Sequence, residues 1–266
     1  MYHAEYSAAS YCSALNAPGQ QVTCRDNICP TVTNSDSTIM IAFANKGKAD
    51  TTGFVALDDT AKEIVVAFRG SSSIRNWIAD FNAGFTDAPY CNDCLVHEGF
   101  YGAYQDQADS IRSTVDKLSK ANPTYGITVT GHSLGGALAQ VAAGDFRSKG
   151  FKNVTACTFG SPRIGNKEFS DWVSKSGPNY RFTHTDDPVP RLPLILMGYE
   201  HVSPEYHITK GDSNIPPSNI DILEGGINFG GNTAQNGIVS ADFGAHLHYL
   251  LGPAISSCGD NELEFR

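Results

Sequence analysis

Charge, basic clusters and long apolar runs are all scarce in this sequence. Charged side chains make up 18% of the 266 residues, and 28 acidic against 19 basic residues give a formal net charge of −9. A chain with this balance repels phosphate groups, so we expect no nucleic-acid partner. The longest apolar stretch lies around residues 193–197, far short of the roughly 20 residues that a spanning helix needs. We therefore expect no transmembrane segment.

Internal repeats and low-complexity linkers are also absent, and the start lacks the basic head and apolar core of a signal peptide. Hydrophobic residues at 41% and aromatic residues at 10% argue against disorder and are sufficient for a large core. We therefore predict one domain over residues 1–266 and expect a secreted form to be the mature chain. Asn153 begins the only acceptor pattern for N-glycosylation, which requires a secretory route.

The apolar segments predict alternating strands and helices. Strands are predicted at residues 38–43, 53–57, 63–69, 127–130, 157–159 and 180–184. Helices are predicted at residues 102–121 and 134–149, around 169–173, and weakly at 242–251. Helices between successive strands indicate parallel crossovers. The predicted fold class is therefore α/β, with a mostly parallel sheet covered on both faces and an antiparallel hairpin at one side.

The segment Gly131-His-Ser-Leu-Gly135 carries the sharpest local signal. It directly follows a predicted strand and opens a predicted helix. In a nucleophile elbow, a serine occupies such a strained turn, and the two glycines leave room for neighbouring backbone. The alternative is a simple turn with Ser133 as a helix cap. The strand–turn–helix context favours the elbow and makes Ser133 the candidate nucleophile.

A serine nucleophile needs a base, and the base needs an orienting carboxylate. In this arrangement the chain order is Ser, then Asp or Glu, then His. Asp186 and Asp187 both follow the predicted strand that ends at His184, and Pro188 holds Asp187 extended. The residues alone do not decide between these two carboxylates.

Four histidines are candidates for the base. His246 and His248 lie near the C-terminus, as the chain order requires, and the pattern favours His246 because it opens the last predicted helical stretch. We expect His201 and His207 to lie on the surface of a loop and a strand. The choice between His246 and His248 stays open at this level.

Backbone donors for an oxyanion are predicted on both sides of the elbow. One is the amide of Leu134, directly after the nucleophile, and the other is the amide of Ser71, at the end of an earlier strand. An amphipathic helix is predicted next to Ser71, at about residues 73–82. Its apolar face could simply pack in the core, but its position favours a lid over the serine. The residues of this apolar face are Ile74, Trp77, Ile78 and Phe81.

Seven cysteines are an odd number, so at least one has no partner within the chain. Cys91 and Cys94 form a CxxC pair, which could indicate a redox motif or half of a zinc site in a cytosolic protein. We favour instead an oxidising compartment, with short loop disulfides and one long bridge from Cys12 to Cys258. Cys157 would then remain as a buried free thiol in an apolar strand.

Several motifs together resemble the secreted filamentous-fungal lipases of the class 3 triacylglycerol lipase family. The matching motifs begin at Tyr6 (YSAASYC), Phe68 (FRGS), Asn76 (NWI), Gly131 (GHSLGGALA), Phe159 (FGSPRIGN), His184 (HTDDPVPRLP) and Ala245 (AH). The resemblance implies the α/β-hydrolase fold, with Asp187 as the acid and His246 as the base. It implies three disulfides, Cys12–Cys258, Cys24–Cys29 and Cys91–Cys94, and an acyl groove near Phe100, Val189 and Leu192.

The expected function is therefore a secreted carboxylic-ester hydrolase, a lipase that acts on acylglycerols at a lipid–water interface without a metal or organic cofactor. Two alternatives stay open. The segment from Cys91 to Gly99 also resembles fungal feruloyl esterases, although the apolar predicted lid and Gly136 favour the lipase. A non-catalytic lipid-binding protein on the same fold should lack a triad member, and none is missing. Residues 259–266 resemble no family hallmark, and we assign this possible C-terminal extension no function.

Overall fold

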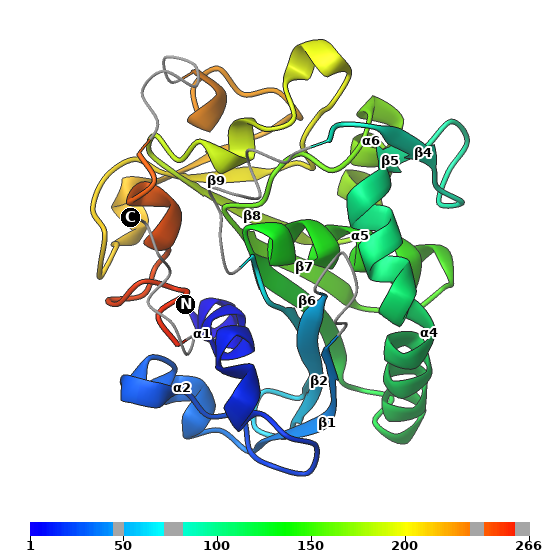
Figure 1. The fold of residues 1–266 in the computed structure, drawn as a ribbon, viewed down its shortest axis with the longest axis vertical. Helices are drawn as coiled ribbons and strands as arrows, with labels where there is room; N and C mark the ends of the chain where they lie inside the picture. Colours follow the sequence, from blue (N-terminus) through cyan, green and yellow to red (C-terminus); the bar gives the residue numbers. More distant parts are fainter. Residues whose placement is uncertain (45–50, 72–81, 235–241, 259–266) are drawn as a thin grey trace.

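An eight-stranded sheet runs through the computed structural model of the chain (Figure 1). The structure describes residues 1–44, 51–71, 82–234 and 242–258. In spatial order the strands are β1 (Ser37–Ala44), β2 (Thr52–Asp58), β3 (Glu63–Phe68), β6 (Gly126–His132), β7 (Val154–Phe159), β8 (Asn179–His184), β9 (Glu205–Ile208) and β10 (Ile220–Leu223). A separate two-stranded sheet is formed by β4 (Phe85–Asp87) and β5 (Leu95–His97).

The inner five strands, from β3 to β9, are parallel, whereas β1 and β2 at one edge and β10 at the other are antiparallel to their neighbours. The mostly parallel sheet with a hairpin at one side is as predicted. The second antiparallel edge, β9 with β10, was not predicted. Both strands are only four residues long, so they carry little alternation for a sequence pattern to detect.

Helices cover both faces of the sheet (Figure 1). The α-helices are α1 (Tyr2–Ala9), α2 (Pro30–Thr33), α4 (Glu98–Ala121), α5 (Leu134–Ser148) and α6 (Lys167–Ser176). Alternate residues of β3 point to opposite faces: Ile64 and Val66 join the core under α4, α5 and α6, and Val65 and Ala67 join the core under α1 and α2. One strand thus contributes to two apolar layers.

Short 3-10 helices occupy many connections, and their bounds are η1 (Ser10–Leu15), η2 (Arg25–Asn27), η3 (Val189–Arg191), η4 (Ile195–Met197), η5 (Pro217–Asn219), η6 (Asn232–Ala234) and η8 (Ala245–Leu247). The prediction of a weak helix over residues 242–251 was wrong, because only the single turn η8 forms there. No helix within the described ranges is long and apolar enough to cross a bilayer.

Helix α1 was missed because it has almost no polar face. Its residues from Ala4 to Ala9 are all buried, so the hydrophobic periodicity that reveals a surface helix is absent. Helix α4, in contrast, has a clear apolar face and begins four residues earlier than predicted. His97 caps it, since the side chain accepts a hydrogen bond from the backbone N–H of Phe100.

Three disulfides join Cys12 to Cys258, Cys24 to Cys29, and Cys91 to Cys94. These are the pairs that the family resemblance implied. The first connects the N-terminal segment after α1 to the end of the described chain, across a separation of 246 residues. Cys157 on β7 is a buried free thiol.

Candidate active site

The turn between β6 and α5 holds Ser133 in a strained conformation. Its φ of 57° and ψ of −127° lie in a region that L residues rarely adopt. A Cβ at Gly131 would collide with the backbone of Gly135, and a Cβ at Gly135 would collide with the backbone carbonyl of Phe68. Both positions therefore require glycine, and together they allow the sharp turn that places Ser133 at the start of a helix.

Asp187 lies fully buried in the loop after β8. Its Oδ1 accepts a hydrogen bond from the backbone N–H of Val189 at 2.8 Å, and its Oδ2 accepts one from His246 Nδ1 at 2.8 Å and another from the hydroxyl of Tyr249. Asp186 instead points outward, and Arg191 pairs with it at 3.2 Å. Of the two adjacent carboxylates, only Asp187 contacts the candidate base.

The carboxylate of Asp187 sets the tautomer of His246. Because an ionised carboxylate only accepts hydrogen bonds, Nδ1 of His246 donates, which leaves the lone pair on Nε2 available for a proton. Ser133 and His246 are both fully buried, and within the described parts of the chain neither Ser133 Oγ nor His246 Nε2 has a hydrogen-bond partner. Such contacts are often long in a free enzyme and shorten when substrate binds.

His132, the second residue of the elbow motif, links the elbow to the histidine loop. Its Nε2 lies 2.7 Å from the backbone carbonyl of His246, so Nε2 donates, and its Nδ1 accepts from the hydroxyl of Tyr11 at 2.8 Å. Burial, followed by the neighbouring His246, holds the pKa of His132 well below its usual range. A neutral ring fits both hydrogen bonds. In the elbow motif this position is the variable residue, so the motif gave no sign of these contacts.

Ser71 follows the end of β3 and Leu134 begins α5, and their role as the two oxyanion donors stays a prediction. Leu134 is the first residue of α5, where backbone N–H groups have no partner within the helix. Ser71 follows Gly70, whose backbone lies so close to the carbonyl of His132 and the hydroxyl of Tyr11 that no Cβ would fit. The end of β3 therefore reaches the serine turn.

Behind the site, a buried network holds the acid loop in place. The side-chain amide of Asn232 donates to the backbone carbonyls of Thr185 and Asp187, and its own backbone N–H donates to Glu205 at 3.0 Å. Burial alone would raise the pKa of Glu205, but the Arg181 charge and hydrogen bonds from several side chains lower it to about 2. An ionised Glu205 thus supports the loop of Asp187.

His201 and His207 are both buried, so the expectation that they lie on the surface was wrong. His207 Nδ1 hydrogen-bonds the hydroxyl of Thr183 on the neighbouring strand β8, and His201 Nε2 donates to the carbonyl of Pro190 at 2.7 Å. Burial lowers the pKa of each ring. Both histidines therefore belong to the packing beneath the acid loop, which the strands β8 and β9 create only in the folded chain.

The three predicted acyl-groove residues occupy different surroundings. Phe100 is buried in the core under α4 and stacks on His97 with 4.1 Å between ring centroids. Val189 is buried beside the carboxylate of Asp187, whereas Leu192 is partly exposed. Their role in acyl binding stays a prediction. The predicted lid, with Ile74, Trp77, Ile78 and Phe81, lies outside the described residues, as does the tail 259–266.

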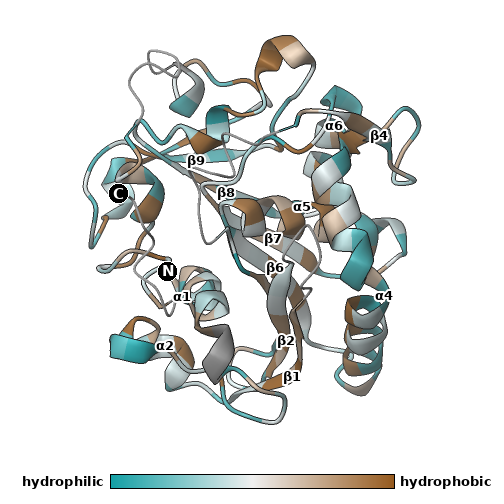
Figure 2. Cartoon of the chain, viewed as in Figure 1, coloured by the Kyte–Doolittle hydropathy of each residue, from teal (hydrophilic) through white to brown (hydrophobic). Residues whose placement is uncertain are grey.

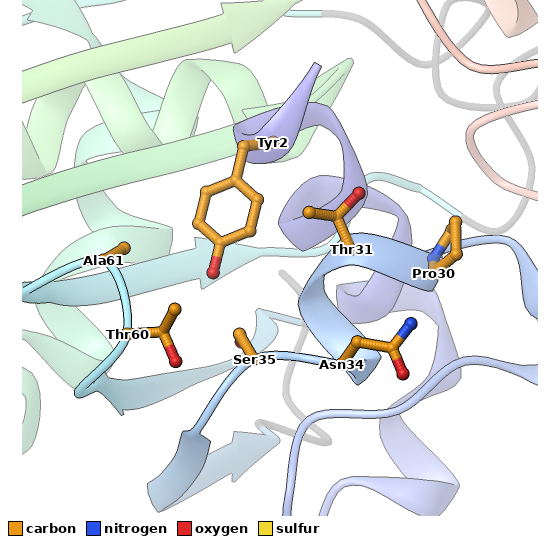
Figure 3. Close-up of a pocket in the computed structure, with 7 residues that line it drawn as sticks. All are labelled: Tyr2, Pro30, Thr31, Asn34, Ser35, Thr60 and Ala61. Carbon is orange, nitrogen blue, oxygen red and sulfur yellow. The ribbon is translucent and has the colours of Figure 1, made fainter.

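Two further predicted positions lie away from the serine. Asn153 is exposed in the turn before β7, where a glycan would have room, and its modification stays a prediction. A surface pocket of about 620 Å³ lies between the N-terminus, α2 and the β2–β3 turn (Figure 3). None of the residues that line it belongs to the predicted catalytic set; they are Tyr2, Pro30, Thr31, Asn34, Ser35, Thr60 and Ala61.

Similarity to known proteins shows which family this chain belongs to. The family model for lipase (class 3) matches residues 65–197. Secreted mono- and diacylglycerol lipase A of Penicillium cyclopium is 39% identical over 250 residues, which covers 93% of this chain and 82% of the relative. The chain belongs to the class 3 lipase family.

Two further relatives of this lipase support the same family. Secreted mono- and diacylglycerol lipase 1 of Fusarium solani is 41% identical over 256 residues and is covered to 75% of its length, with 95% of this chain matched. The crystal structure of mono- and diacylglycerol lipase from Aspergillus oryzae matches with a TM-score of 0.90 and 40% identity, over 97% of this chain and 96% of that chain.

These findings confirm the predicted α/β-hydrolase fold and the prediction of a secreted carboxylic-ester hydrolase of the lipase type. They do not favour an aromatic-ester esterase or a non-catalytic lipid-binding protein, because the relatives are named as lipases.

Proposed function

We propose that this lipase hydrolyses acylglycerol esters through Ser133, His246 and Asp187. The observation that carries the proposal is the hydrogen bond from His246 Nδ1 to the buried Asp187, at 2.8 Å. This contact leaves the Nε2 lone pair of a buried histidine unused beside a strained serine elbow. A base in this protonation state is what a serine nucleophile needs.

In the proposed reaction, His246 Nε2 takes the hydroxyl proton as Ser133 Oγ attacks the ester carbonyl. The amides of Ser71 and Leu134 donate hydrogen bonds to the oxygen that becomes negative. His246 then protonates the departing glycerol oxygen, and an acyl-enzyme on Ser133 remains. Water, deprotonated by the same histidine, releases the fatty acid. Asp187 stays ionised throughout and stabilises the imidazolium that forms twice in each cycle.

Substrate class and site of action follow from the relatives and from the charge of the chain. The relatives named as mono- and diacylglycerol lipases support partial glycerides as substrates, alongside triacylglycerol. We further propose that the enzyme meets them at a lipid–water interface. With a net charge of −9, adsorption to neutral lipid depends on apolar burial rather than on charge attraction. Added salt should therefore not weaken it.

The test compares the two C-terminal histidines in matched variants. His246→Ala should lower kcat on emulsified diacylglycerol by at least about thousandfold, as should Ser133→Ala, because both remove a member of one catalytic unit. His248→Ala, two residues away and outside the hydrogen bonds to Asp187, should retain activity. Hydrolysis that survives in Ser133→Ala, or that is lost in His248→Ala but not in His246→Ala, would overturn the mechanism.

A further inference from the structure

The longest apolar run of the sequence lies on the surface of the folded protein. Around the single turn η4, Leu196 is 96% exposed, Met197 49% and Leu194 40%. Figure 2 shows this turn in brown, projecting from the edge of the molecule, and Figure 1 shows it in yellow between η3 and β9. Single exposed apolar residues are common, but a contiguous apolar tip indicates a surface that meets another apolar phase.

Hydrogen bonds hold this tip outward. The backbone N–H of Met197 donates to the carbonyl of Leu194 at 2.9 Å, which closes the turn. At its base, the guanidinium of buried Arg163 donates to the carbonyls of Arg191 and Pro193. The exposure of the apolar side chains is therefore a property of an ordered turn.

The far side of the turn is anchored as well. Tyr199 stacks on Phe85 of β4, with 4.1 Å between ring centroids, and its hydroxyl donates to the carbonyls of Ala83 and Gly84. The tip thus lies between the loop of Asp187, seven residues upstream of Leu194, and the segment that enters β4. Arg163 links the base of the tip to the acid loop, because the same guanidinium donates to the carbonyls of Arg191 and Pro193.

We propose that residues 194–197 form a fixed anchor that inserts into a neutral acylglycerol surface. Residues 192–199 carry no charged side chain, so burial in lipid desolvates no charge. Their connection to the acid loop would bring the bound surface next to Ser133. The inference rests on the proposed function, since it assumes that the substrate is an interface. It differs from the predicted lid because the anchor needs no movement.

The decisive measurement is adsorption in the absence of hydrolysis. In a Ser133→Ala background, binding to triolein droplets is measured by depletion of protein from the aqueous phase. Leu196→Asp should weaken adsorption by about tenfold or more, because it places a charge at the most exposed position of the tip. Met197→Ser should weaken it severalfold, without a change in unfolding temperature.

Met40→Ser provides the matched control. Met40 is 37% exposed, close to the 49% of Met197, but lies on the edge strand β1 at the other end of the sheet. Its replacement should leave adsorption unchanged. Equal adsorption of Leu196→Asp and the parent, or equal losses for Met40→Ser and Met197→Ser, would overturn the anchor. Because the measurement does not depend on turnover, failure of the triad mechanism would leave this result interpretable.

A second copy of the chain is the competing occupant of the tip. Sedimentation of the parent and of Leu196→Asp distinguishes the two cases. A monomeric parent supports the lipid anchor. A dimer that dissociates on Leu196→Asp would assign the tip to self-association and overturn the proposal.

Discussion

Two fully buried aspartates, Asp187 and Asp58, have nearly the same kinds of hydrogen-bond partners at opposite ends of the strands. Asp58 ends β2 beside the start of β3, whereas Asp187 follows the end of β8. Asp58 accepts hydrogen bonds from the hydroxyls of Tyr2 and Tyr6 and, at its other oxygen, from the backbone N–H groups of Thr60 and Ala61. Asp187 likewise accepts from a tyrosine hydroxyl and a backbone N–H. Each carboxylate is fully paired, as burial requires.

The difference is one partner that can change its charge. Every partner of Asp58 is a fixed donor at neutral pH, and burial, supported by Asp58 itself, raises the pKa of Tyr2 to about 12. The corresponding partner of Asp187 is His246, whose other nitrogen has no partner within the described ranges. A buried carboxylate can therefore stabilise the fold or orient a base, and the two roles differ in whether one of its hydrogen-bond partners can change its charge.

Neutralising each aspartate in turn should produce the largest difference between the two sites. Asp187→Asn should lower kcat by about 10⁴-fold, because the amide favours the wrong tautomer of His246. Asp58→Asn should leave kcat per folded molecule unchanged but cost about 2–3 kcal/mol of unfolding free energy, since its donors lose a charged acceptor. Initial rates on diacylglycerol emulsions and urea unfolding measure the two effects. A fall in kcat for Asp58→Asn would remove the distinction.

A milder change removes a tyrosine hydroxyl that donates a hydrogen bond to each aspartate. Tyr249→Phe deletes one donor to Asp187 and should lower kcat by roughly tenfold, the value of one charge-assisted hydrogen bond. Tyr6→Phe deletes the equivalent donor to Asp58 and should cost about 1.5–3 kcal/mol of stability with kcat unchanged. The two phenylalanine variants are isosteric, so packing is conserved in both. If Tyr249→Phe had the same kcat as the parent, Tyr249 would have only a structural role.

Acid titration should reveal the smallest effect, through another buried carboxylate, Glu205. The pKa of Glu205 in the folded protein, about 2, lies below the ordinary value of 4.5. The ionised group therefore contributes stability above about pH 4.5, and that contribution is lost as the pH falls towards 2. Unfolding midpoints measured from pH 6 to pH 2.5 should fall less steeply for Glu205→Gln than for the parent. Parallel curves would show that Glu205 is not a source of acid sensitivity.

Local features were predictable because their causes are local. The elbow follows from two glycines around Ser133 between an apolar strand and a helix, and helix α4 follows from its apolar periodicity. Helix α1 and strand β10 were missed for the opposite reason: one is buried on all sides and the other spans four residues, so neither has a contrast of faces to detect.

The surface positions assigned to His201 and His207 were wrong because burial of a polar ring depends on partners far away in sequence. His207 is buried by pairing of β9 with β8, and His201 by the acid loop whose carbonyl it contacts. The alternation of residues along a strand shows which share a face, but not whether that face is covered by another element.

The nucleophile turn and the family could be recognised without the fold, because a strained turn and a set of contiguous motifs depend on neighbouring residues. The family resemblance implied the pairing of Asp187 with His246, but the individual residues did not, because that contact spans 59 residues and adjacent strand-end residues point in different directions. The tertiary structure also decided whether the longest apolar run is buried or exposed. Hydrophobicity indicates that a segment avoids water, but only the packed chain shows that Leu194, Leu196 and Met197 are left exposed at the surface.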